Sequence, residues 1–444
     1  MQNRVARAAM VAILAVALFT AGGIGVFRRL GAVSPPASSP APTADTLLQP
    51  VVSGSLDQII GSLQQRLRVL PTDWHSYASL GLAYVQQARL TADPSYYPKA
   101  EGVLSRSLSI ESKDNFEAMV GMAALAAGRH DFGGALRWGE RAKAINPYNA
   151  NVYGVIGDAQ VELGRYRDAD ATFQKMVDTL PGLASYARVS YARELQGNVA
   201  GAIVSMQAAF DVAGMPADQA WASNQLGDLE FNRGHLVAAE ADYRRAAGLD
   251  PAFVPAQAGL AKVAWAKGDL QEAIRGYTSV VATYPLPDYV IALGDLESAA
   301  GNRAGATRQA GLVRVEAHLF KANGVNVDLE LALFDADHGN ARAALLAARA
   351  EWQRRHSVLV ADALAWALHA NHRDAEAWRY EQRAMSIGYR NALFFFHAGE
   401  IRLALGDRSG AIAELQRAIA TNPHFSIRWA PVAQRDLARL ETSP

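Results

Sequence analysis

The sequence predicts an all-α fold, a solenoid of about ten helix-turn-helix repeats with a helical cap at each end. From Ser55 onward, apolar residues recur at spacings of three and four, which is the helical period, and no alternating strand pattern recurs. A small residue returns every 33 to 38 positions, at Ala100, Ala135, Ala169, Ala202, Ala239, Ala273, Ala306, Ala344, Ala377 and Ala411. One helix hairpin cannot bury its apolar face alone, so a repeat of this length predicts hairpins stacked into a solenoid.

The first 29 residues are predicted to be a signal anchor, a single transmembrane helix. Residues 8–27 are 20 residues without a charge, the length that crosses about 30 Å of hydrocarbon as a helix. Arg4, Arg7 and the amino terminus outweigh Arg28 and Arg29 slightly, which favours a cytoplasmic N-terminus and a solenoid outside the cytoplasmic membrane. Two alternatives stay open: cleavage near Ala21-Gly22-Gly23 would secrete the chain, or the segment is a buried helix or precedes an inward-facing domain.

Residues 30–54 are rich in Pro, Ser and Ala, which predicts an extended, solvated linker. The solenoid is expected over 55–441. Residues 55–71 are predicted to be a capping half repeat, a lone second helix, and residues 427–441 a closing helix. Both would cover the apolar ends of the stack.

Two glycine patterns define each predicted hairpin. In the first, a Gly five positions before the marked Ala stops one helix and reverses the chain, because Gly accepts the left-handed conformation. These turn glycines are Gly164, Gly197, Gly234, Gly268, Gly301, Gly339 and Gly406. In the second, a small residue twelve positions before the Ala lets two helices approach, so Gly157 is expected to face Ala169 between the larger Ile156 and Phe173.

The pattern resembles the tetratricopeptide repeat, a 34-residue helix-turn-helix. The clearest unit carries Tyr153, Ile156, Gly157, Ala169 and Phe173, followed by Pro181. The resemblance covers residues 70–425 and is weakest over 328–351 and 361–384. Together with the predicted anchor, the chain resembles a membrane-anchored bacterial member of this family. The resemblance implies a right-handed α-solenoid whose first helices line a concave groove.

Composition and motifs favour no enzymatic chemistry. Basic and acidic residues balance at 43 each, whereas proteins that coat nucleic acid normally carry a basic surplus. Cysteine is absent, so disulfides and thiolate chemistry are excluded. No Walker loop, nucleophile elbow or His-Glu-x-x-His motif occurs. His369 and His372 are interpreted as a solvated turn. We therefore predict no catalytic residue, cofactor, metal, nucleic acid or small-molecule substrate.

The resemblance implies a partner-binding groove. In the family, groove positions lie at fixed distances from the small residue of each first helix. Carried over to this sequence, they give the candidate groove residues Asp158, Glu162, Tyr191, Glu194, Asn224, Asp228, Phe231, Lys262, Trp265, Asp295 and Trp366. Aromatic side chains flanked by acids suit a peptide with apolar anchors and basic groups. An alternative is that some of these aromatics wedge between neighbouring hairpins.

The expected function is a non-catalytic protein-protein interaction scaffold, tethered to the membrane, that binds a peptide or protein partner. The alternative is a structural subunit of a bacterial envelope assembly for secretion, cytochrome maturation or polysaccharide export. An enzyme is the third and least favoured class.

Overall fold

The computed structural model describes residues 53–442, with side chains from residue 56 onward. These residues form 22 α-helices joined by turns, and no strand occurs among them. The helices are α3 (Ser53–Val69), α4 (Trp74–Thr91), α5 (Tyr96–Ile110), α6 (Phe116–Gly128), α7 (Phe132–Ile145), α8 (Ala150–Glu162), α9 (Tyr166–Thr179), α10 (Leu183–Leu195), α11 (Val199–Val212), α12 (Pro216–Asn232), α13 (Leu236–Leu249), α14 (Val254–Ala266), α15 (Leu270–Thr283), α16 (Pro287–Ala299), α17 (Arg303–Ala322), α18 (Asp328–Asp337), α19 (Ala341–Arg354), α20 (Val358–His369), α21 (Asp374–Ala384), α22 (Ala392–Ala404), α23 (Arg408–Thr421) and α24 (Ala430–Thr442).

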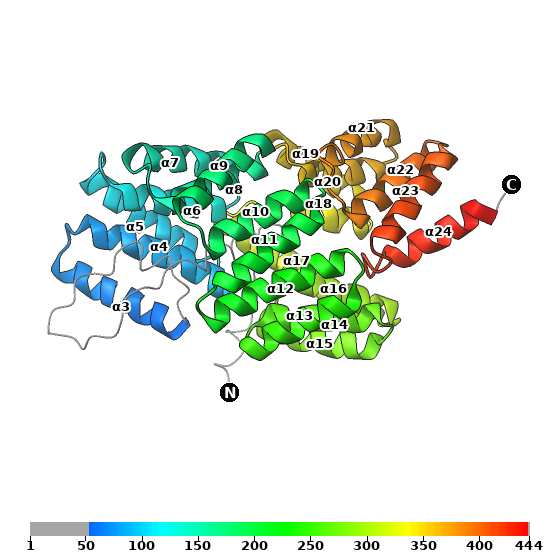
Figure 1. Cartoon of the computed structure of the whole chain (residues 1–444), viewed down its shortest axis with the longest axis horizontal. Helices are drawn as coiled ribbons and strands as arrows, with labels where there is room; N and C mark the ends of the chain where they lie inside the picture. Colours follow the sequence, from blue (N-terminus) through cyan, green and yellow to red (C-terminus); the bar gives the residue numbers. More distant parts are fainter. Residues whose placement is uncertain (1–52, 443–444) are drawn as a thin grey trace.

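The helices from α4 to α23 pair into ten antiparallel hairpins, α4 with α5 through α22 with α23, which confirms the predicted helical repeat array (Figure 1). Helix α3 precedes the first hairpin near the predicted half repeat, and α24 follows the last near the predicted closing helix. The predicted anchor, 1–29, and most of the linker lie outside the described residues. Across residues 53–442, none of the helices combines the length and the apolar character needed to cross a membrane.

The turns inside the hairpins have the conformation that the glycine pattern predicts. All seven turn glycines adopt φ between +74° and +89°. In two hairpins a histidine holds the corresponding position, His130 at φ 61° and His372 at φ 58°. These left-handed residues end the first helix and start the second, so the chain reverses within a few residues.

The small residues of the first helices make room for a large side chain of the second helix. A Cβ added to Gly157 would lie 2.2 Å from the Phe173 ring, and one added to Gly227 would lie 2.6 Å from the Tyr243 ring. The residue that fills the space at Gly157 is therefore Phe173, four positions after Ala169, because the aromatic ring reaches into the notch that the glycine leaves.

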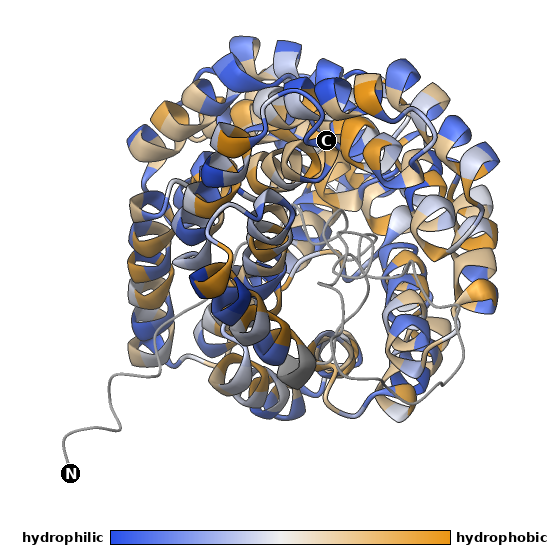
Figure 2. Cartoon of the chain, turned by 90° about the vertical axis from the view of Figure 1, so that its left-hand side faces the viewer, coloured by the Kyte–Doolittle hydropathy of each residue, from blue (hydrophilic) through white to orange (hydrophobic). Residues whose placement is uncertain are grey.

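The solenoid winds so tightly that one superhelical turn rests on the next. Tyr284 donates to the carbonyl of Arg89, 195 residues earlier, and the side chain of Asn422 donates to the carbonyl of Phe231, 191 residues earlier. Figure 2, turned by 90° from Figure 1, shows the helices arranged in a ring around an axis. We call the line of contact between residues 89–234 and residues 284–423 the inter-turn seam.

Candidate partner-binding surface

The inter-turn seam is held at its centre by buried charges. Arg355, at the end of α19, is 3% exposed and pairs with both Glu351 and Glu162, and Glu162 comes from α8 of the preceding turn. Burial raises the pKa of Glu162 to about 7, although Arg355 opposes that shift. Glu162 is 1% exposed, so the structure uses this candidate groove residue to join two turns of the superhelix.

The seam continues through polar and apolar contacts on both sides of this ion pair. The amide of Val358 donates to the hydroxyl of Tyr166 at 2.7 Å, and the amide of Asn326 donates to the carbonyl of Arg129 at 3.1 Å. Tyr191, another candidate groove residue, lies in one buried apolar cluster with Val358 and Phe394 of the later turn. These contacts join residues that are more than 160 positions apart in the sequence.

Two further candidate residues, Asp158 and Glu194, are buried along α8 and α10. Asp158 accepts two hydrogen bonds of 2.8 Å from the guanidinium of Arg188, in the neighbouring hairpin. Glu194 lies within 3.5 Å of the side-chain amide of Asn232, and burial raises its pKa to about 7. Both carboxylates therefore serve contacts between hairpins of the same turn.

A polar network on α12, α13 and α14 contains four of the candidates. Asp228 accepts hydrogen bonds from Tyr243 at 2.7 Å, from Lys262 at 2.9 Å and from Asn224 at 3.0 Å. The ammonium of Lys262 also lies 4.4 Å from the centre of the Phe231 ring. Asn224 and Phe231 are buried, whereas the side chains of Asp228 and Lys262 are 37% and 28% exposed. Only the last two of this group present surface to solvent.

The last three candidates meet the C-terminal part of the chain. Trp265 is half-buried and touches His424 edge-on, with ring centroids 6.2 Å apart. Asp295 accepts from Arg428 at 2.8 Å and lies 3.4 Å from His338. Trp366 is buried, stacks on His397 and donates to Asp337 at 2.7 Å.

The structure thus separates the eleven candidates into two groups. Seven are buried in contacts within the chain, and four are only partly buried, on the first helices of three consecutive hairpins. We call Asp228, Lys262, Trp265 and Asp295 the first-helix surface. Its flank is completed by His424 and Arg428, which the sequence did not suggest because they lie after the last hairpin. Partner binding by these residues stays a prediction.

No protein-family model matches the chain. The cellulose synthase 1 operon protein C of Komagataeibacter xylinus is 27% identical over 246 residues, which are 52% of this chain and 18% of that protein. The chain therefore spans less than a fifth of the length of that relative.

Several solved structures resemble the chain at low sequence identity. The human IFIT1 dimer with PPP-AAAA is 13% identical, with a TM-score of 0.47, over 74% of this chain and 78% of that one. PilF of Pseudomonas aeruginosa is 18% identical, with a TM-score of 0.36, over 48% of this chain and 92% of that one. A tetratricopeptide repeat protein from Parabacteroides merdae is 12% identical, with a TM-score of 0.32, over 74% of this chain and 99% of that one.

The hairpins, their period and their left-handed turns define the class of the protein. Ten hairpins repeat with the expected small residues, and a left-handed residue reverses the chain within them. Residues 53–442 therefore form an array of helical hairpins that resembles the tetratricopeptide repeat.

Proposed function

We propose that the chain is a non-catalytic interaction scaffold whose first-helix surface binds a peptide or protein partner. The observation that carries the proposal is the combination of half-buried Trp265 with the partly exposed charges of Asp228 and Lys262, beside Asp295, whose side chain is 13% exposed and paired with Arg428. Tryptophan is enriched among the energetically important positions of interfaces, and charged groups around it can set the orientation and choice of the partner. Because Asp228 already holds Lys262, a basic group of a partner would compete with that lysine for the carboxylate.

The assembly that we propose is a bacterial envelope machine that handles a polysaccharide. The support is the 27% identity to a protein named for a cellulose synthase operon, over 52% of this chain. The proposed location is the outer side of the cytoplasmic membrane, with residues 1–29 as a single-pass anchor, or secretion after cleavage of that segment. The uncharged stretch over residues 8–27 supports this placement.

The proposal predicts that Trp265→Ala weakens partner capture. Removing a half-buried tryptophan from an interface centre typically costs about 2 kcal/mol or more of binding energy. In-cell crosslinking followed by mass spectrometry would recover the partner with the wild-type chain and lose most of it with the variant. Far-UV circular dichroism would show whether helical content is unchanged.

The matched control is Tyr148→Ala, which removes an aromatic side chain that is 86% exposed in the turn before α8. This variant should capture the partner as the wild type does. If both variants keep the partner while folded, the first-helix surface is not the binding surface. If both lose it equally, the loss is not specific to that surface.

A further inference from the structure

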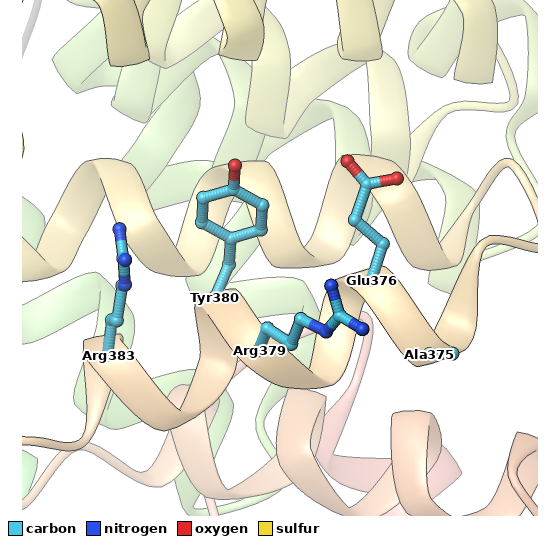
Figure 3. A pocket seen from close by; sticks show the side chains of 5 residues that line it. All are labelled: Ala375, Glu376, Arg379, Tyr380 and Arg383. Atoms are coloured by element: carbon cyan, nitrogen blue, oxygen red, sulfur yellow. The ribbon is translucent and has the colours of Figure 1, made fainter.

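The outer helix α21 carries a second surface whose composition differs from that of the first-helix surface. A concavity of about 490 Å³ is lined by Ala375, Glu376, Arg379, Tyr380 and Arg383 (Figure 3). In this view Glu376, Tyr380 and Arg383 point to the same side of the helix. The lining residues all belong to the second helix of the ninth hairpin, and we call them the α21 surface.

The α21 surface has an excess of positive charge. Its acid, Glu376, is already paired with two arginines outside the concavity, Arg349 at 3.5 Å and Arg373. Arg379 and Arg383 are exposed, and neither has a carboxylate partner among the described residues. The helix has two other carboxylates. Asp374, its first residue, pairs with His369 at 2.6 Å, and Glu381 is fully buried, which raises its pKa well above the ordinary value, so Glu381 offers no surface charge to balance the arginines.

Aromatic rings hold one of these two cations in place. The guanidinium of Arg383 lies 5.6 Å from the ring centre of Trp352 and 5.8 Å from that of Tyr380. Tyr380 meets Trp352 edge-on, with centroids 5.2 Å apart. An arginine over an aromatic face gains cation–π attraction while it keeps its N–H donors for another group. The Arg383 guanidinium can therefore rest near both rings and still donate hydrogen bonds to a ligand.

We propose that the α21 surface docks an acidic segment of a partner protein. Two arginines one helical turn apart can each pair with a carboxylate, and Arg, Tyr and Trp are the residues enriched at the centres of protein-protein interfaces. The half-buried ring of Tyr380 adds apolar contact area, which favours a peptide over a free anion. This surface is on the second helix of a hairpin, so the inference goes beyond the partner proposed for the first helices.

The experiment places a photoreactive benzoylphenylalanine at Tyr380 in the full chain and identifies the crosslinked peptide in cells by mass spectrometry. The expected product joins position 380 to a segment rich in Asp and Glu. Arg379→Glu with Arg383→Glu should abolish the adduct. The same segment, made as a synthetic peptide, should bind the Arg379→Ala, Arg383→Ala chain about tenfold more weakly or worse than the wild type, because charge-assisted hydrogen bonds are lost.

The matched control reverses two exposed arginines on another outer helix, Arg303→Glu and Arg308→Glu in α17. It changes net charge by the same amount and should keep the adduct, as should Trp265→Ala, which separates this test from that of the first-helix surface. The proposal is overturned if no adduct forms, if the crosslinked segment is not acidic, if the adduct joins a lipid, or if it survives charge reversal on α21.

Discussion

Replacing Arg355 with methionine should reduce the free energy of unfolding by about 3–5 kcal/mol, the largest effect that we expect from a single side chain. The substitution leaves Glu162 and Glu351 buried, at 1% and 0% exposure, without the cation that both contact. Breaking a buried ion pair by removing one partner strands a charge in a medium that solvates it poorly. Equilibrium denaturation measures the loss, and faster hydrogen exchange at the Val358 amide would locate it at the seam.

The loss should depend on pH in a definite direction. The pKa of Glu162 is about 7 in the folded chain because burial raises it above its usual value, and Arg355 opposes that rise. Without Arg355, the pKa rises further, so the folded state binds a proton that the unfolded state has released. Stability of the variant then falls as the pH rises through the neutral range, and the deficit is larger at pH 8 than at pH 6.

Two further variants test whether the stability loss comes from the buried ion pair of Arg355. Arg354→Met removes the preceding arginine, whose side chain is 43% exposed and also pairs with Glu351, and should cost at most about 1 kcal/mol. Adding Glu162→Gln to Arg355→Met should recover part of the loss, because one stranded carboxylate becomes neutral. Equal losses for the two arginine variants would show that the buried pair does not hold the seam.

The second large effect is expected from Gly164→Ala, compared with Gly268→Ala. Both glycines end a first helix in the left-handed region, at φ +78° and +89°, where a side chain costs about 1–2 kcal/mol. At Gly268 an added Cβ meets nothing within 4 Å, whereas at Gly164 it would lie 2.6 Å from the backbone carbonyl oxygen of His356, in the next superhelical turn. The Gly164 variant should therefore lose clearly more stability than the Gly268 variant.

Urea denaturation of the two glycine variants tests this comparison, since the backbone strain is common to both. Gly197→Ala provides a second seam position, because its Cβ would lie 2.3 Å from the carbonyl oxygen of Gly388. If all three variants lose the same stability, the turns of the superhelix do not touch in solution as they do in this structure.

The hairpins could be predicted from the sequence because their determinants are local. The turn at Gly164 needs a residue that accepts the left-handed conformation, and the notch at Gly157 needs a residue without a Cβ. Residues that accept that conformation and small residues recur at fixed spacing at these two places of the hairpins. The side chain that occupies the notch at Gly157 was not specified by the repeat pattern. Phe173, expected beside this pair, reaches into the notch itself, since spacing along a helix does not reveal how far a ring reaches.

The candidate groove was predicted less completely, for a physical reason. Position within a repeat shows which way Glu162, Tyr191 and Phe231 leave the first helix, but not what faces them. The structure brings residues from 191 to 195 positions later against this part of the chain. The repeat unit carries no signal for a contact at that separation, because it depends on small rotations between hairpins that add up over more than five repeats.

The central claim is that successive turns of the superhelix contact each other, and two introduced cysteines test it most directly. The chain has no cysteine of its own, so thiols at His235 and His424 would be unique. These positions flank a contact in which a Cβ on Gly234 would lie 3.1 Å from Pro423. A short bifunctional maleimide should join the two thiols in the folded protein and fail to do so in urea. Labelling of both thiols without any crosslink in the folded protein would contradict the stacked superhelix.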